Sequence, residues 1–287
     1  MYQLSDMATI KSILSRHGFY FSKSLGQNFL INPEVCPRMA AECGAGKGTG
    51  VLEVGPGIGV LTAELAKIAE KVVSVELDQR LLPVLNETLS GFSNVKVVNG
   101  DILKEDIHRL LSEEFAGMEV VVCANLPYYI TSPIIMRLLE EHLPIRAITV
   151  MVQKEAANRL CALPGTRECG AVSATVQYYA EPKILFEVER SSFLPPPNVD
   201  SAVIRLDLRT ESAVNIKSET HFFALVKAAF AKRRKTVLNS VTAGLSMGRE
   251  TVSRALERAQ IPPNARAEQL TMEQLAAFSN ELFQNER

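Results

Sequence analysis

Residues 52–59 read Leu-Glu-Val-Gly-Pro-Gly-Ile-Gly, and they give the strongest indication of the fold. It closes an apolar run typical of a buried strand, and a helix is predicted to begin directly after it. Glycine lets the backbone turn sharply and pass close to a ligand, and the start of the helix offers free N–H groups. The Gly-x-Gly-x-Gly spacing differs from that of dinucleotide-binding sites, and Pro56 has no N–H. A ligand-binding turn and a tight turn with no ligand are both compatible with this stretch.

The same alternation of short apolar runs and longer amphipathic segments continues on both sides of this turn. Strands are predicted at residues 51–54, 72–76, 95–98, 120–124 and 147–152. Helices are predicted at residues 61–69, 79–89, 107–115 and 133–141. This order predicts a doubly wound, mostly parallel sheet with right-handed crossovers, covered by helices on both faces.

The pattern changes in the last third of the chain. A predicted helix at 171–180 precedes two strands, 183–188 and 201–208, which follow one another without a crossover helix and predict an antiparallel edge. Only helices are predicted beyond them, at residues 221–231, 235–243, 250–258 and 268–282. We therefore expect an α/β domain at residues 1–209 and a small all-α domain at residues 210–287.

Composition excludes several classes of protein. The 287 residues are 47% hydrophobic and carry a net charge of −1, as expected of a folded globular chain. The five cysteines form no Cys-x-x-Cys pair and the four histidines are scattered, which argues against a zinc site and Ser-His-Asp chemistry. No stretch approaches ~18 apolar residues, and Asp6 and Lys11 lie where a signal peptide would be apolar. We expect a cytoplasmic protein with no metal and no membrane partner.

Polar residues mark the ends of consecutive predicted strands. Glu76 ends the second strand, Asp101 follows the third, and Asn125 follows the fourth. A solvated glutamate or a helix-capping aspartate explains either acid alone. Because the carboxyl ends of parallel strands meet at one edge of the sheet, where open α/β sheets bind ligands, the set together predicts a binding site.

This constellation resembles the class I S-adenosylmethionine-dependent methyltransferases, which have a Rossmann-like fold. Residues 125–128, Asn-Leu-Pro-Tyr, resemble the motif of the bacterial 16S rRNA adenine N6-dimethyltransferase family. Further segments agree with that family, so the resemblance covers nearly the whole chain: Ser24-Leu25-Gly26-Gln27-Asn28-Phe29-Leu30, Val152-Gln153-Lys154-Glu155, Gln177-Tyr178-Tyr179, Ser192-Phe193-Leu194-Pro195-Pro196-Pro197, Val199-Asp200-Ser201-Ala202 and Arg233-Arg234-Lys235-Thr236. It implies dimethylation of N6 on two adjacent adenosines in the 3′-terminal hairpin loop of 16S rRNA, linked to small-subunit maturation.

The resemblance also implies how S-adenosylmethionine is bound. It assigns Asn28 and Leu30 to the region of the cofactor's amino-acid end, and Gly55 to its methionine moiety. Glu76 is implied to bind the ribose hydroxyls and Asp101 the adenine amine, roles that suit carboxylate acceptors. From the residues alone, Gln27-Asn28 is also compatible with an Asx-type turn before a helix.

The resemblance places the chemistry on residues 125–128. Oxygen atoms of Asn125 and Leu126 would accept hydrogen bonds from the adenine amine and release its lone pair, while Tyr128 would stack on the base. Phe193 would close the other face of the base, although an aromatic before three prolines is also typical of a core residue. Asn125 is also counted with the cofactor-binding residues. A base inside a duplex cannot reach such a pocket, so the target base must be unpaired or flipped out.

The carboxyl-terminal part of the chain carries the basic residues. Residues 203–287 contain 13 Lys and Arg against 9 Asp and Glu, and Lys232, Arg233, Arg234 and Lys235 follow one another. This basic run predicts contacts with RNA phosphates, and a solvated helix start is the alternative. We expect a monomer that binds 16S rRNA within a small-subunit precursor. Two alternatives stay open: a macrolide-resistance type of 23S rRNA adenine N6-methyltransferase, and a non-catalytic ribosome assembly factor.

Overall fold

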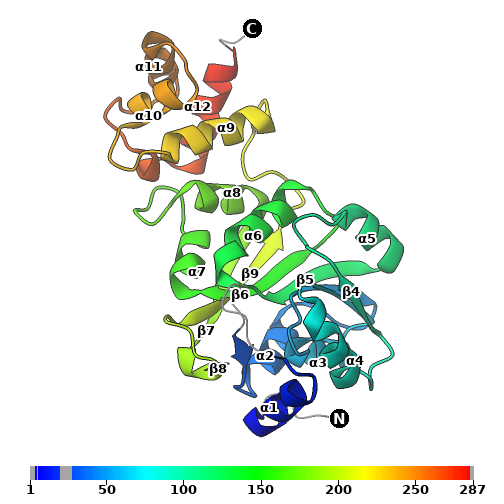
Figure 1. The fold of residues 1–287 in the computed structure, drawn as a ribbon. Helices are drawn as coiled ribbons and strands as arrows, with labels where there is room; N and C mark the ends of the chain where they lie inside the picture. The colour runs from blue at the N-terminus through cyan, green and yellow to red at the C-terminus, as the bar shows by residue number, and fades with distance from the viewer. Residues whose placement is uncertain (1–3, 5, 20–27, 285–287) are drawn as a thin grey trace. The chain divides into compact units, whose positions relative to one another are not determined.

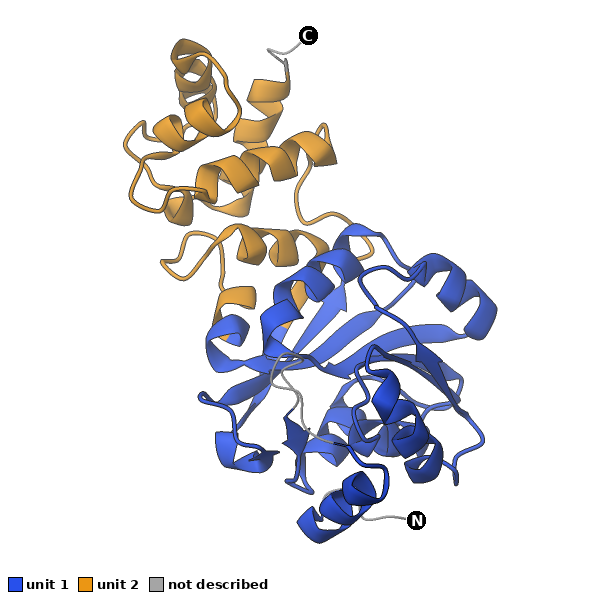
Figure 2. Cartoon of the chain, in the orientation of Figure 1, with its two compact units in different colours: residues 1–157, 183–208 blue, residues 158–182, 209–287 orange. Residues whose placement is uncertain are grey.

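A computed structural model describes residues 4, 6–19 and 28–284 of the chain (Figure 1). Residues 24–27 of the Ser24–Leu30 motif lie outside this range. The chain divides into two compact units, which are coloured separately in Figure 2. The first unit contains residues 1–157 and 183–208, and the second contains residues 158–182 and 209–287.

A seven-stranded sheet organises the first unit, in the order β4-β3-β2-β5-β6-β9-β7. The strands from β4 to β6 pair in parallel, and β9 pairs antiparallel with β6. A separate two-stranded sheet joins β1 to β8. The strand bounds are β1 Phe29–Leu30, β2 Thr49–Val54, β3 Lys71–Glu76, β4 Val95–Asn99, β5 Glu119–Asn125, β6 Ala147–Gln153, β7 Ala180–Val188, β8 Phe193–Leu194 and β9 Ser201–Leu208.

Helices cover both faces of this sheet. Figure 1 shows α2 and α3 on one side and α5 and α6 on the other. Apolar residues of α2 and α3 form one buried cluster with Val121 and Cys123 of β5 and with Ala147 and Met151 of β6, which lie on one face of the sheet. The helix bounds are α1 Met7–Arg16, α2 Val35–Glu42, α3 Val60–Ala66, α4 Leu82–Thr88, α5 Ile107–Glu114, α6 Thr131–Glu140 and α7 Lys154–Leu160, and the 3₁₀ turns are η2 Gln79–Leu81, η3 Tyr128–Ile130 and η4 Arg190–Ser192.

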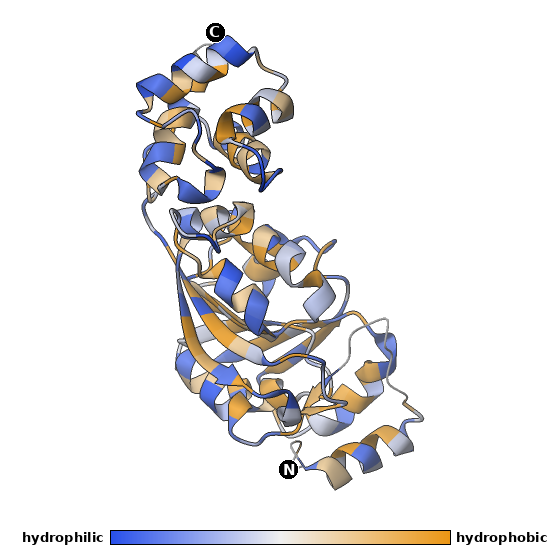
Figure 3. Cartoon of the chain, turned by 90° about the vertical axis from the view of Figure 1, so that its left-hand side faces the viewer, coloured by the Kyte–Doolittle hydropathy of each residue, from blue (hydrophilic) through white to orange (hydrophobic). Residues whose placement is uncertain are grey.

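The burial pattern explains why the sheet is predominantly parallel. All six residues of β2 are buried, as are residues 120–124 of β5 and 147–152 of β6. Figure 3 shows these strands coloured mainly as hydrophobic residues, whereas the surrounding helices carry both hydrophobic and hydrophilic residues. Strands that are apolar along their whole length need helices on both faces, which right-handed crossovers supply. The doubly wound α/β fold with an antiparallel strand near its edge is confirmed.

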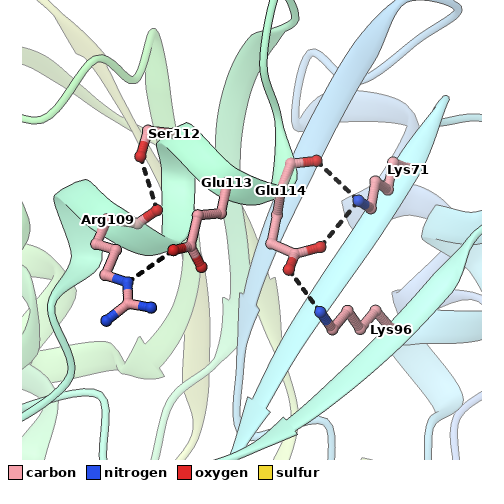
Figure 4. A network of polar contacts seen from close by, with 6 residues as sticks. All are labelled: Lys71, Lys96, Arg109, Ser112, Glu113 and Glu114. Atoms are coloured by element: carbon pink, nitrogen blue, oxygen red, sulfur yellow. Dashed lines mark hydrogen bonds and ion pairs between the residues drawn. The ribbon is translucent and has the colours of Figure 1, made fainter.

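A polar network ties the amino-terminal half of two strands to a helix (Figure 4). Glu114 at the end of α5 accepts hydrogen bonds from Lys71 of β3 at 2.9 Å and from Lys96 of β4 at 2.5 Å. The carbonyl of Glu114 also accepts from the Lys71 ammonium at 2.8 Å. Arg109 and Glu113 form a separate exposed pair one turn earlier on α5.

The second unit is helical around its own core, which contains Phe222, Leu225, Val241, Leu256 and Phe278. Its helices are α8 Ala171–Tyr179, α9 Glu219–Phe230, α10 Val237–Gly244, α11 Arg249–Arg258 and α12 Met272–Gln284, with the 3₁₀ turn η5 Ala267–Gln269. The all-α carboxyl-terminal region is confirmed.

Residues 158–182 belong to the second unit, whereas the predicted division at residue 209 placed them in the first. The reason is the packing of α8. The Tyr178 ring lies 5.5 Å from the Phe222 ring, and the Tyr179 ring stacks on Phe223 at 5.3 Å. The sequence alone does not indicate which of the two hydrophobic cores these side chains join.

Candidate active site

One pocket contains all nine residues that the sequence analysis assigned to cofactor binding and chemistry. It lies at the carboxyl ends of β2, β3, β4 and β5 and is also lined by β1, β8 and η3. The nine residues are Asn28, Leu30, Gly55, Glu76, Asp101, Asn125, Leu126, Tyr128 and Phe193. The structure therefore brings these residues together, as expected from parallel strands that end at one edge.

The glycine turn after β2 forms the floor of this pocket. Gly55, Gly57 and Gly59 have φ angles of 68°, 62° and 89°, a left-handed conformation that other residues rarely adopt. A Cβ atom at Gly55 would have no atom within 4 Å, so the backbone there faces open space. Gly59 precedes the first turn of α3.

Glu76 ends β3 with its carboxylate held in place. Oε1 accepts a hydrogen bond from the Asp78 N–H at 2.8 Å, and Oε2 accepts from the Gly57 N–H at 3.3 Å. The residue is only 6% exposed, and this burial raises the pKa of its carboxyl above the ordinary value. A fixed carboxylate at this position suits donors such as ribose hydroxyls.

The next strand end carries Asp101. Gly100 donates its N–H to the Glu76 carbonyl at 2.9 Å, and the Asn99 side chain donates to the same carbonyl at 2.8 Å. These bonds hold the ends of β3 and β4 together. Asp101 Oδ1 accepts from the Leu103 N–H at 3.1 Å, so this aspartate caps a turn as well as lining the pocket.

The end of β5 presents an amide and a carbonyl. Asn125 is the last residue of β5, and the N–H of the buried Leu126 donates to the Met151 carbonyl at 3.2 Å. Pro127 fixes the peptide that follows Leu126, because its φ is limited to −58° and its carbonyl accepts from Ile130 N–H at 3.2 Å. The Asn125 side chain and the Leu126 carbonyl are thus held at the pocket wall.

Tyr128 is oriented by a hydrogen bond across the sheet. Its hydroxyl lies 2.6 Å from Ser201 Oγ at the start of β9. Burial raises the pKa of this phenol, so it stays protonated over the physiological range. With its far end fixed, the ring can present one face to the pocket.

The pairing of β1 with β8 adds the last wall. Leu30 pairs with Phe193, and the Ile31 N–H donates to the Ser192 carbonyl at 2.8 Å, so segments about 160 residues apart lie side by side. Phe193 is only 2% exposed and belongs to the same apolar cluster as Leu30. It lines the pocket as a largely buried side chain.

Glu53 and Tyr129 are among the lining residues of this pocket that the sequence analysis did not assign to it. Glu53 lies in β2 and is 1% exposed, and its Oε2 accepts from Thr62 and Ser74 hydroxyls, each at 2.6 Å. Burial raises the pKa of Glu53 to about 7. A charged residue inside an apolar strand was a readable signal for it. Tyr129, which also lines the pocket, had no such signal.

The basic run lies in the second unit, outside this pocket. Lys232, Arg233, Arg234 and Lys235 are all exposed and connect α9 to α10. The predicted helix from residue 235 starts only at Val237, because Thr236 acts as its N-cap. Lys232, Arg233 and Lys235 line a pocket of this unit together with residues of α8 and Arg159.

The part of the chain that the structure describes lacks two further features. No group of three or more His, Cys, Asp and Glu side chains in that part of the chain is arranged to hold a metal ion. None of the described helices is long and apolar enough to cross a membrane.

The strand order, and a pocket at the point where that order reverses between β2 and β5, define a class I S-adenosylmethionine-dependent methyltransferase. Its donors and acceptors fit that cofactor, since open space faces Gly55 and a fixed carboxylate stands at Glu76. The chain belongs to the ribosomal RNA adenine dimethylase family, whose model matches residues 18–284.

Individual relatives agree with this family. The chain is 50% identical over 284 residues to ribosomal RNA small subunit methyltransferase A of Geobacillus sp. (strain WCH70), covering 96% of this chain and 98% of the relative. It is 49% identical over 287 residues to the protein of the same name in Bacillus mycoides (strain KBAB4), with 98% of each chain covered.

Solved structures show the same fold. The crystal structure of the 23S rRNA methyltransferase ErmE has 29% identity and a TM-score of 0.67, covering 89% of this chain and all of that one. A dimethyladenosine transferase from Plasmodium falciparum has 24% identity and a TM-score of 0.70, covering 87% of this chain and 95% of that one.

Proposed function

We propose that this chain transfers methyl groups from S-adenosylmethionine to N6 of two adjacent adenosines in the 3′-terminal hairpin loop of 16S rRNA, within a small-subunit precursor. The observation that carries the proposal is the shared pocket of Glu76, Asp101 and residues 125–128. The first two suit a nucleoside-containing cofactor, and the last four suit an exocyclic amine.

The cofactor would lie along the edge of the sheet. Gly55 would lie against its methionine moiety, with Asn28 and Leu30 near its amino-acid end, and Asn125 would contribute from the end of β5. Glu76 would accept from the two ribose hydroxyls and Asp101 from the adenine amine. When bound, the cofactor supplies a methyl group attached to a positively charged sulfonium. The neutral thioether that remains after transfer is a good leaving group.

The protein's own task is to prepare the nucleophile. The lone pair of an adenine amine is delocalised into the ring, so the amine is a poor nucleophile. Acceptance of its two hydrogens by the Asn125 side-chain oxygen and the Leu126 carbonyl favours a pyramidal nitrogen with a free lone pair. Tyr128 would stack on one face of the base and stabilise the developing positive charge, and Phe193 would close the other face.

The second unit would help to hold structured RNA. Its exposed basic run, Lys232, Arg233, Arg234 and Lys235, suits phosphate contacts. The target adenosine would have to leave its stack to enter the pocket. We propose that the protein acts as a monomer in the cytoplasm, where its ribosomal substrate is assembled.

The test is methyl transfer to purified small subunits that lack the modification. With isotopically labelled S-adenosylmethionine, we expect N6,N6-dimethyladenosine at two adjacent positions of the 3′-terminal hairpin. Asn125→Ala is the control, with transfer nearly abolished and affinity for RNA largely kept. Absence of product with the wild-type protein, under conditions where a relative from Geobacillus or Bacillus is active, would refute the proposal.

The same experiment decides between the proposal and its alternatives. The identity of about 50% to small-subunit methyltransferases, against 29% to ErmE, favours a small-subunit substrate. The sequence pI of about 6.5 agrees, since the macrolide-resistance relatives tend to be strongly basic. Transfer to 23S rRNA alone would reverse this choice. Normal subunit assembly with an inactive variant, together with an assembly defect on deletion of the protein, would reveal a separate assembly role.

A further inference from the structure

Tyr129 is an exposed aromatic residue at the methyl-transfer pocket. It lines the pocket, yet it is 55% exposed, whereas Leu126 in the same segment is 2% exposed. Single exposed apolar residues are ordinary on protein surfaces, so the exposure alone means little. Its position does matter, because it follows directly the residue proposed to stack on the target base.

The local backbone sends the two tyrosines in different directions. Residues 128–130 form the 3₁₀ turn η3, in which successive side chains are rotated by about 120°. Tyr128 is tied to Ser201 Oγ of the sheet by its hydroxyl. Tyr129 therefore points away from that anchor, and its exposure places it on the solvent side of the pocket lining.

A base that leaves its stack also exposes a face of its neighbour. The proposed function requires such a step for each adenosine, since the pocket lies at the end of β5 and takes one base at a time. An aromatic ring beside the entrance can cover the exposed face. Base stacking on aromatic side chains tolerates any sequence, because every base has a π face.

We propose that Tyr129 stacks on the nucleotide next to the adenosine in the pocket and so selects RNA in which that neighbour is unpaired. This inference rests on the proposed function and adds a second base contact to it. Because stacking is indifferent to base identity, the same residue serves both methylations when two adjacent adenosines enter in turn.

The test uses single-turnover methyl transfer to unmodified small subunits, measuring the half-saturating subunit concentration and the maximal rate separately. For Tyr129→Ala we expect the half-saturating concentration to rise about 5- to 150-fold, which corresponds to the ~1–3 kcal/mol of a stacked base. The maximal rate and the affinity for S-adenosylmethionine should change less than about threefold. Tyr129→Phe, which keeps the ring, should behave as wild type. Ile68→Ala is the matched control, because Ile68 is an exposed apolar residue (37%) just before β3, at the opposite edge of the sheet.

Removal of the neighbouring base separates stacking from a structural role. Subunits are reconstituted with 16S rRNA that is abasic on the 5′ or the 3′ side of the reacting adenosine. On one of these two substrates, we expect Tyr129→Ala to cause no further rise in the half-saturating subunit concentration. The inference would be overturned if Tyr129→Ala raised the half-saturating concentration on both abasic substrates as much as on intact subunits. It would also be overturned if Tyr129→Ala behaved as wild type on intact subunits. A wild-type protein that methylates no subunits would instead reject the proposed function, and this inference with it.

Discussion

Replacement of Glu76 by alanine tests the proposed cofactor site at a single side chain. The carboxylate is 6% exposed and fixed by the Asp78 and Gly57 N–H groups, so it needs no rearrangement to accept from a ligand. A hydrogen bond to a charged acceptor contributes about 1.5–3 kcal/mol, and the proposed role involves two hydroxyls. Allowing for non-additivity, we expect a loss of about 2–4 kcal/mol, or roughly 30- to 800-fold in the dissociation constant.

The assay is isothermal titration calorimetry with S-adenosylmethionine and with its demethylated product. Both ligands carry the same ribose, so Glu76→Ala should weaken them by the same factor. Glu76→Gln keeps a neutral acceptor and should lose only about tenfold. Glu113→Ala is the control, because Glu113 is an exposed residue on α5 and lies outside the pocket lining.

The pH dependence gives an independent readout. Burial raises the pKa of Glu76, so its carboxyl becomes protonated at a higher pH than an ordinary glutamate. A protonated carboxyl accepts less strongly, and wild-type affinity should fall as the pH drops through that raised value. The profile of Glu76→Gln should be flatter. A folded Glu76→Ala protein whose dissociation constant changes less than about threefold would refute the assignment of Glu76 to the ribose.

Three further predictions concern stability and RNA binding. Burial raises the pKa of Glu53 from 4.5 to about 7, so the contribution of Glu53 to stability is complete below pH 4.5 and falls by about 3 kcal/mol as the pH rises through 7. Urea unfolding should show this loss of stability in the wild type but not in Glu53→Gln. Hydrogen bonds from two lysines lower the pKa of Glu114, so its contribution to stability is present above the ordinary carboxyl pKa and is lost in acid (Figure 4). At pH 7, Glu114→Gln should lower the free energy of unfolding by about 1 kcal/mol, and the exposed Glu113→Gln by less than ~0.5 kcal/mol. Neutralising residues 233–235 together should flatten the dependence of RNA affinity on log salt by roughly 0.7–0.9 per lost phosphate contact, with cofactor affinity unchanged, and an unchanged slope would place the RNA elsewhere.

The sequence predicted the parts of the fold that depend on local periodicity. The predicted strands at 72–76 and 201–208 differ from β3 and β9 by at most one residue, because their apolar runs are bounded by polar residues. Helix α1 was not predicted, although the sequence indicates it. Ile10, Ile13 and Leu14 have helical spacing and follow an N-cap at Asp6. Helix α2 gave a weaker signal, because it is short, has Pro37 in its first turn and has no side-chain cap.

The candidate site divides along the same line. Glu76 and Asn125 end β3 and β5, and Asp101 lies two residues after the end of β4, so their shared location could be predicted from strand order alone. The wall formed by β1 and β8 could not, because two-residue strands have no periodicity and their pairing joins Leu30 to Phe193 across the chain. Only the family resemblance suggested these residues, and it gave no contact between them.

This division has a consequence for the chemistry. The groups that would recognise the cofactor lie at strand ends, where hydrogen bonds to the neighbouring strands fix their positions. The wall at Phe193 instead depends on the pairing of two short strands, β1 and β8, that lie far apart in the sequence. Phe193 is buried at 2% exposure beside Leu30, so a smaller residue there would open a cavity in the apolar cluster as well as remove the proposed cover of the base. Stability and base binding are therefore coupled at Phe193, whereas at Asn125, a partly exposed strand end, they can be separated. That is why Asn125→Ala, and not a Phe193 variant, is the appropriate inactive control for methyl transfer.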